Sequence, residues 1–203
     1  VHEDMSLDPL TDYSKFKAEC EKILFKYTSD NFVTSVIRPA TVCGYSPRQR
    51  LDLVINILTN LAYHKKEISV FGGSQLRPNI HIKDMVRAYE LFIEIDPNKI
   101  NGKIFNVGFE NKTVNELALS VKSVIGDDVK INTVPTNDNR SYRVCCDRLY
   151  DRLGFKCERT IISAIDDLKK SFVDGRVCDP MSNQFHYNIK WIYHHIENVE
   201  ANL

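Results

Sequence analysis

The chain has 203 residues, of which 43% are hydrophobic and 27% charged, enough to bury the core of about one domain. Its 27 basic and 27 acidic residues cancel, which disfavours a general nucleic-acid binder or a membrane-surface protein. No apolar run approaches the roughly 18 residues that cross a bilayer. The six cysteines contain no C-x-x-C pair, which disfavours a zinc site and is typical of reduced thiols in the cytoplasm.

Taken in chain order, the sequence predicts helices that alternate with strands. The segment 32–37 is short and rich in β-branched residues, which is typical of a buried parallel strand, and we expect it to end at Arg38-Pro39. Thr113 and Glu116 form a capping-box pattern before an apolar run. The predicted helices are 13–27, 51–65, 83–95, 114–125, 147–153 and 160–173, and the other predicted strands are 68–71, 103–108 and 129–134. This alternation predicts an α/β fold.

A phenol and an ammonium stand four residues apart in the first predicted helix, at Tyr13 and Lys17. Side chains at this spacing are neighbours on one helix face. A neighbouring cation favours the phenolate form of a tyrosine, which can then exchange a proton with a sugar or alcohol hydroxyl. The pair alone is weak evidence, and its meaning depends on the motifs that follow it.

The motifs after Tyr13 resemble, in order, those of the extended short-chain dehydrogenases/reductases, in their NAD-dependent epimerase/dehydratase branch that acts on nucleotide sugars. The matching stretches are DPLTDYSKFK (8–17), RPATVCG (38–44), VFG (70–72), LRPNIHIKD (76–84), FNVG (105–108) and LGF (153–155). The resemblance implies a Rossmann-like parallel sheet with core strands near 32–37 and 103–107. It also implies a smaller α+β substrate-binding lobe from 51–80 and 129–156. We expect 1–175 to form the family's domain and 176–203 a C-terminal helical extension.

The family's glycine-rich strand-turn-helix, which holds the dinucleotide pyrophosphate, has no match in this sequence. Gly72-Gly73 is the only glycine doublet, and it lies in the wrong half. The chain therefore resembles the C-terminal portion of such an enzyme. The family's catalytic serine or threonine would lie upstream of Val1. We expect the chain by itself to be inactive because part of the active site is absent.

The resemblance assigns the reaction to Tyr13 as acid/base and to Lys17, which would favour its phenolate and contact the nicotinamide ribose. Pro39 and Val42 follow a strand at its carboxyl end, where open α/β sheets place ligands, and become cofactor-side candidates. A strand-ending proline is the ordinary alternative for Pro39. NAD is the expected cofactor; NADP stays open, because the acidic residue that separates the two would also lie upstream.

The resemblance also implies a substrate site for a nucleotide-diphosphate sugar. Arg77 has the fork of donors that suits a pyrophosphate, with a surface salt bridge as the alternative. The predicted substrate-binding residues are Asn56, Val70, Phe71, Arg77 and Arg140, with Arg143 open as an alternative to Arg140 and core packing as an alternative for Phe71. Arg48 and Arg50 flank a loop that could reach substrate or be solvated. His81 and Asp84 are expected to hold the loop and cap the next helix.

The leading functional hypothesis is an NAD-dependent nucleotide-sugar epimerase/dehydratase that works through a transient keto sugar. A short-chain reductase of a smaller carbonyl substrate shares Y-x-x-x-K but has less use for two phosphate-binding arginines. A non-catalytic NAD-sensing or scaffold relative is the third reading, disfavoured by the intact Tyr13 and Lys17. A homodimer of the full-length protein is also open. The upstream sequence would separate these hypotheses.

Overall fold

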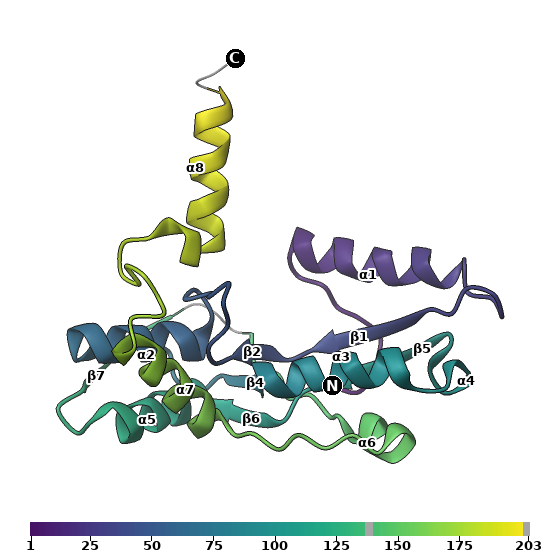
Figure 1. Ribbon diagram of the computed structural model, residues 1–203, viewed down its shortest axis with the longest axis horizontal. Helices are drawn as coiled ribbons and strands as arrows, with labels where there is room; N and C mark the ends of the chain where they lie inside the picture. The colour runs from purple at the N-terminus through teal and green to yellow at the C-terminus, as the bar shows by residue number, and fades with distance from the viewer. Residues whose placement is uncertain (137–139, 201–203) are drawn as a thin grey trace.

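The computed structural model describes residues 1–136 and 140–200 as an elongated α/β assembly (Figure 1). The helices are α1 (Asp12–Phe25), α2 (Val54–Lys65), α3 (Ile82–Glu94), α4 (Pro97–Ile100), α5 (Val114–Ile125), α6 (Asp147–Leu153), α7 (Ile161–Val173) and α8 (Asn188–Glu200), with a 3-10 turn η1 (Gln184–His186). The strands are β1 (Ser35–Pro39), β2 (Thr41–Cys43), β3 (Glu67–Phe71), β4 (Leu76–His81), β5 (Lys103–Val107), β6 (Glu110–Thr113) and β7 (Lys130–Val134).

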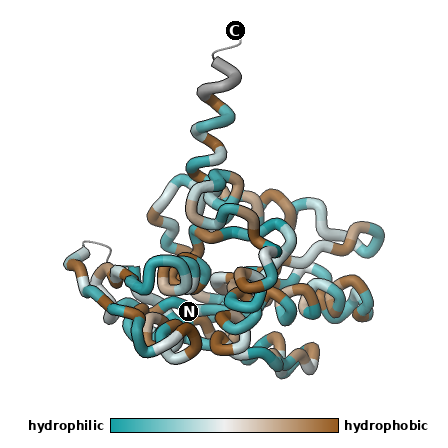
Figure 2. The backbone as a smooth tube through the Cα atoms, turned by 60° about the vertical axis from the view of Figure 1, so that its left-hand side comes forward, coloured by the Kyte–Doolittle hydropathy of each residue, from teal (hydrophilic) through white to brown (hydrophobic). Residues whose placement is uncertain are grey.

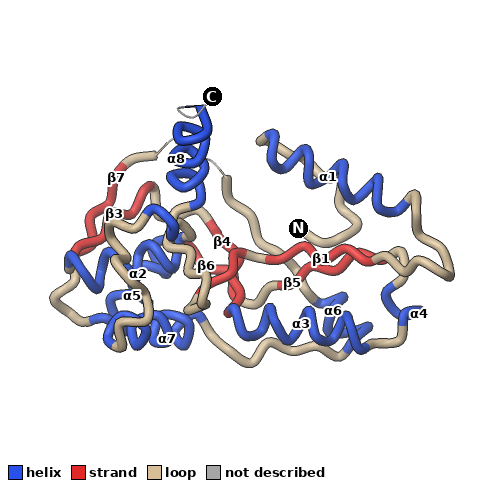
Figure 3. Tube along the Cα trace, turned by 45° about the horizontal axis from the view of Figure 1, so that its top comes forward, coloured by secondary structure: helices blue, strands red, loops and turns tan. Residues whose placement is uncertain are grey.

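The strands form three small sheets that follow one another along the molecule (Figure 3). At one end β1 pairs in parallel with β5, and at the other end β3 pairs in parallel with β7. Between them β4 pairs in parallel with β2 and antiparallel with β6. The expected parallel pairing between the strands near 32–37 and 103–107 is therefore present, and the expected α/β class is confirmed.

The largest core lies under the β3–β7 sheet, where the apolar faces of α2, α5 and α7 meet. Five of its fully or nearly fully buried side chains are Ile55, Leu58, Ile68, Leu117 and Ile165. A second core joins the β1–β5 sheet to α3 and α6, with Phe105 at its centre. The helices α1 and α3 lie on opposite sides of the β1–β5 sheet (Figures 1 and 3), and α3 covers its side with buried Met85 and Ala88.

Several boundaries differ from the sequence prediction. The first strand begins at Ser35 and runs through Pro39, while Phe32 lies in a turn that its amide closes onto the Ser29 carbonyl at 3.3 Å. The strands β2 and β6 were not predicted, because three or four residues carry too little pattern and both depend on β4 for their hydrogen bonds. The helix expected from residue 51 starts at Val54.

The caps agree more closely with the prediction. Thr113 and Glu116 form the expected capping box at the start of α5. Gly154 ends α6 in the left-handed region that favours glycine. Thr160 caps α7 by accepting a hydrogen bond from the amide of Ser163.

The packing cuts across two predicted boundaries. The helix α6, placed by sequence in the substrate lobe, packs against β5 instead, with Leu149 in the same core as Phe105. The predicted boundary at residue 175 does not interrupt the packing either, because Val177 is buried with Leu51, Leu168 and Phe172. Beyond this segment α8 stands clear of the body, with hydrophilic and hydrophobic residues alternating along its first turns (Figure 2).

Candidate active site

A cleft of about 620 Å³ opens at the carboxyl ends of β1 and β2. Its walls come from the first turn of α1, the loop between β2 and α2, and the exposed side of α3. This is the edge at which parallel α/β sheets place their ligands. The side chains that line the cleft include Tyr13, Pro39, Val42, Arg48, Gln49, Arg50, Asn56 and Tyr142.

Tyr13 reaches this cleft from the first turn of α1. Thr11 caps the helix through a capping box with Ser14, which fixes where the helix begins and therefore where the phenol lies. The Tyr13 side chain is 75% exposed, so its hydroxyl is open to a ligand. Lys17 is exposed one turn further along the same helix, but of the two predicted catalytic side chains only Tyr13 is among those that line the cleft.

Pro39 and Val42, the two cofactor-side candidates, both lie in the cleft wall. Between them the chain passes from β1 to β2 through Ala40, whose amide donates to the Val107 carbonyl at 2.7 Å. This bond keeps the two strands in one continuous edge, so the wall is rigid backbone rather than a free loop.

Arg38 turns away from the cleft and ties α1 to β1. Its guanidinium donates to both carboxylate oxygens of Glu21, at 2.9 and 2.6 Å, and to the Glu3 carbonyl at 3.2 Å. The hydrogen bonds that it donates to Glu21 raise the arginine pKa above its usual value despite partial burial. The bidentate pair holds the helix that carries Tyr13 against the strand that carries Pro39.

Asn56 is buried at the base of the cleft and supports its loop. Its Oδ1 accepts from the Gly44 amide at 3.0 Å, and its Nδ2 donates to the Arg50 carbonyl at 2.8 Å. Both polar atoms of the Asn56 side chain therefore already bind the backbone, and the predicted contact with substrate would have to share them. Gln49 also supports this loop, because its side-chain oxygen accepts from the Ser46 amide at 3.0 Å. The sequence did not predict this role.

Val70 and Phe71 face opposite sides of β3. Val70 is fully buried in the large core, so only its backbone could touch a ligand, whereas Phe71 is 57% exposed. The alternation along β3 carried this signal, because Ile68 and Val70 share one face of a strand. Core packing, which was the alternative considered for Phe71, is the role of Val70.

The two predicted phosphate-binding residues lie together. The Arg77 guanidinium donates to the carbonyl of Arg140 and, at 3.0 Å, to that of Leu76. Ser141 accepts from the Leu76 amide at 3.0 Å, which fixes the 140–143 segment beside β4. The neighbouring Tyr142 enters the cleft, and the sequence analysis did not select it.

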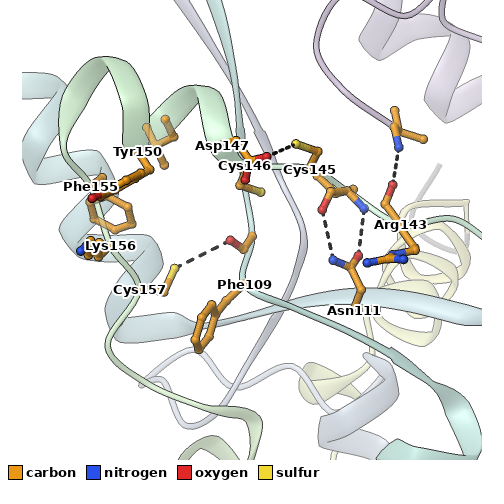
Figure 4. A pocket seen from close by; sticks show the side chains of 14 residues that line it. Phe109, Asn111, Arg143, Cys145, Cys146, Asp147, Tyr150, Phe155, Lys156 and Cys157 are labelled. Carbon is orange, nitrogen blue, oxygen red and sulfur yellow. Dashed lines mark hydrogen bonds between the residues drawn. The ribbon is translucent and has the colours of Figure 1, made fainter.

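A second cavity of about 820 Å³ lies between α6 and the end of β5 (Figure 4). Arg143, the alternative to Arg140, lines this cavity with three cysteines. Burial raises the pKa of Cys146 to about 12 and that of Cys157 to about 11. Thiols with such pKa values stay protonated near neutral pH, so neither Cys146 nor Cys157 is a ready nucleophile.

His81 and Asp84 hold the structure, as expected. His81 caps α3 through its Nδ1, which accepts from the Lys83 amide at 3.1 Å. Buried Asp84 accepts from the amides of Glu158 and Arg159 at 3.0 and 2.8 Å. Within 1–136 and 140–200 no cluster of His, Cys, Asp and Glu is arranged to hold a metal ion. None of the described helices has the length and apolarity to cross a membrane.

The sheet order and the cleft define the class: an α/β protein of Rossmann-like fold with its candidate site at the carboxyl edge of parallel strands. Residues 1–108 match the model of the NAD dependent epimerase/dehydratase family. This match covers more than half of the chain, and the chain belongs to that family.

The relatives are similar over part of their length. The chain is 29% identical over 119 residues to UDP-D-apiose/UDP-D-xylose synthase of Oryza sativa subsp. japonica, a match that covers 52% of this chain and 30% of that enzyme. It is 29% identical over 100 residues to (S)-8-oxocitronellyl enol synthase of Catharanthus roseus, covering 46% of this chain and 26% of that one. These matches span less than a third of either relative.

Solved structures share the fold. The UDP-glucuronic acid 4-epimerase from Bacillus cereus, in complex with UDP-glucuronic acid and NAD, aligns with a TM-score of 0.75 at 21% identity. That alignment covers 86% of this chain and 56% of the epimerase. RMD from Pseudomonas aeruginosa, complexed with NADPH, aligns with a TM-score of 0.74 at 20% identity, over 87% of this chain and 61% of RMD.

Proposed function

We propose that the whole protein is an NAD-dependent nucleotide-sugar epimerase/dehydratase in which Tyr13 is the acid/base. The observation that carries this proposal is the position of Tyr13. An exposed phenol on the capped first turn of α1 shares one cleft with Pro39 and Val42 at the carboxyl ends of β1 and β2. A scaffold protein has no need to hold a proton-transfer group at this edge.

The residues present fit the nicotinamide end of the cofactor. Pro39 and Val42 form a wall beside the phenol that an aromatic ring can contact, and Lys17 is exposed on the same helix as Tyr13. When bound, NAD would accept a hydride from the sugar carbon that bears the reacting hydroxyl. NAD rather than NADP is a family expectation.

Tyr13 would remove the proton from that hydroxyl as the carbon is oxidised, leaving a transient keto sugar. Lys17 would favour the phenolate that takes the proton. Returning the hydride to the carbonyl carbon from the other face, while Tyr13 returns the proton to the oxygen, would give an epimer. Loss of water from the keto sugar would make the reaction a dehydration. The epimerase reading leads.

Arg77 and Arg140 would bind the diphosphate of the substrate. The contact between the Arg77 guanidinium and the Arg140 carbonyl supports this role, because it brings two cationic residues to one place beside β4. Asn56 and Phe71 would contribute at the base of the cleft and at the nucleotide, and Val70 through its backbone.

The test is Tyr13→Phe in the whole protein, assayed with added NAD and UDP-glucose or UDP-glucuronic acid by chromatography of the products. We expect kcat to fall by about 10²–10⁴, the usual contribution of a general acid/base, with little change in the affinity for NAD. Tyr27→Phe is the matched control, because Tyr27 is exposed beyond the end of α1 and lies outside the cleft. Full activity in Tyr13→Phe would refute the assignment.

A further inference from the structure

The segment after α7 packs directly on the loop that forms one wall of the cleft. We call residues 176–188 the C-terminal strap and residues 44–53 the cleft loop. The Leu51 amide of the loop donates to the His186 carbonyl of the strap at 2.9 Å. Leu51 is fully buried in a small core that includes Val177. The strap and the loop therefore share both a backbone hydrogen bond and an apolar contact.

His186 is the centre of this contact. Its side chain is buried, and the ring lies between two backbone carbonyls: Nε2 is 2.8 Å from the Cys178 oxygen and Nδ1 is 3.3 Å from the Gln49 oxygen. A carbonyl oxygen only accepts, so the ring donates through Nε2 to close the strap on itself. With Nε2 as the donor, Nδ1 of the neutral ring makes no hydrogen bond to the Gln49 carbonyl, so the ring packs against the backbone of Gln49, which lines the cleft.

Two cleft arginines are held by the strap as well. The Arg48 guanidinium lies over the Phe185 ring, 4.9 Å from its centroid. Arg50 donates to both oxygens of Asp52, at 3.0 and 3.1 Å, and Asp52 also accepts from the Asn188 amide at 3.0 Å. Both arginines line the cleft, so the strap sets where their side chains point.

A separate anchor fastens the strap to α2. The Tyr187 hydroxyl donates to the Pro180 carbonyl at 2.9 Å, and the Asn60 side chain donates to the same carbonyl at 3.1 Å. The Tyr187 ring packs on the same small core as Leu51, but none of the hydrogen bonds of this anchor involves the cleft loop. The strap thus has one contact with the scaffold and another with the binding site, and the two can be altered separately.

We propose that the C-terminal strap is part of the substrate site and that His186 is a positioning residue, which holds the cleft loop in the shape that binds the sugar nucleotide. This inference rests on the proposed function for the nature of the ligand, but not for the contact itself. The strap would act on the substrate side of the cleft, because Arg48, Gln49 and Arg50 line it from the loop between β2 and α2, whereas Pro39 and Val42 are assigned to the cofactor.

The experiment compares His186→Ala, His186→Gln and Tyr187→Phe in the whole protein. Hydrogen exchange of peptides covering the cleft loop is measured by mass spectrometry, and the affinity for UDP-glucose and for NAD by calorimetry. The alanine variant loses the hydrogen bond from Nε2 to the Cys178 carbonyl, which shapes the strap around the carbonyl that binds the Leu51 amide. We therefore expect the Leu51 amide to exchange about tenfold faster in His186→Ala, with exchange in β1 and β5 unchanged. UDP-glucose binding should weaken several-fold and NAD binding should not change.

The glutamine variant separates positioning from general damage, because its amide can donate to the Cys178 carbonyl as Nε2 does. We expect His186→Gln to restore both slow exchange and UDP-glucose affinity, and Tyr187→Phe to leave the cleft loop unchanged. Unchanged exchange in His186→Ala, or faster exchange throughout the protein, would overturn the proposal. If the unaltered protein fails to bind UDP-glucose, the proposed function fails, while the exchange data still decide the role of the strap.

Discussion

The two ends of the molecule bury their apolar surface in different ways. Around the β3–β7 sheet, the helices α2, α5 and α7 close on one another and on the sheet, and side chains such as Leu117 and Ile165 are fully buried. Around the β1–β5 sheet, α3 and α6 cover one side, but α1 on the other side leaves Phe16 and Ile23 more than half exposed. Of the α1 residues, only Ala18 is buried.

This difference shows how the candidate site divides between the two ends. The closed end supplies a rigid floor, through Asn56 on α2, while the open end supplies Tyr13 from a helix that is held chiefly by the Arg38–Glu21 pair. The proposed proton transfer thus falls to a helix with a single buried residue. The comparison can be tested by substitutions at each end.

The largest effect is expected from truncation in the closed end. Leu117→Ala should lower the free energy of unfolding by about 3 kcal/mol, because it leaves a cavity at a fully buried position. Leu119→Ala is the matched control on the same helix, since Leu119 is 60% exposed and should cost less than about 0.5 kcal/mol. Denaturant unfolding measures both. Ile23→Ala on α1 should resemble the control; a cost as large as that of Leu117→Ala would show that α1 is not open.

A smaller effect is expected where the two ends are joined. Buried Asp84 on α3 binds Arg87 at 2.9 Å and Arg159 at 3.0 Å, and Asp84→Asn should cost about 2 kcal/mol by leaving these cations with a neutral partner. Glu158→Gln changes an exposed carboxylate beside the same arginines and should cost less than about 1 kcal/mol. Equal costs would contradict a special role for the buried group.

The same substitution should change the pH dependence of stability. Burial opposes the charged form of Asp84, but hydrogen bonds from the Arg159 and Glu158 amides and from the Arg87 and Arg159 side chains outweigh it and lower its pKa. The stabilisation is therefore complete above the ordinary carboxyl pKa of about 4 and is lost as the pH falls through the lowered value. Thermal unfolding between neutral and acidic pH should show a shallower loss of stability in Asp84→Asn than in the unaltered protein.

The smallest perturbation is chemical labelling of the thiols, which leaves the fold intact. Cys20 on α1 is exposed, whereas Cys43 on β2 is 1% exposed and burial raises its pKa to about 12. At about pH 8, a thiol reagent should modify Cys20 within the period in which Cys43 stays unreacted. Cys20→Ser and Cys43→Ser identify the labelled sites by peptide mass. Modification of Cys43 at the rate of Cys20 would show that the closed end opens readily.

Much of this architecture could be predicted where the signal is local. The capping box at Thr113, the glycine that ends α6 and the β-branched run of β1 all act through nearby residues, and each is present in the structure. The motif also leads us to expect Tyr13 and Lys17 at one cleft; Tyr13 lines the cleft and Lys17 is not among its lining residues, while their catalytic roles stay a prediction.

The remainder depends on contacts between distant segments. The strands β2 and β6 exist through their pairing with β4, and Tyr142 and Gln49 reach the cleft through loops whose course no short pattern records. The sequence predicted that residues after 175 form a separate extension, because nothing near Val177 in sequence indicates that it packs beside Leu51. Such contacts are decided by tertiary packing rather than by propensity.

The order of the two parallel pairings has a consequence for dividing the gene. Strand β3 lies between β1 and β5 in sequence, yet its partner β7 lies beyond β5, so the pairings interleave instead of nesting. A break anywhere between Phe71 and Lys103 leaves each piece with one strand of each pair. Neither piece could then complete a sheet alone, and two separately expressed pieces would have to reassemble by complementation. The two ends of the molecule are distinct in space, but no single break in the chain separates them into two independently folding pieces.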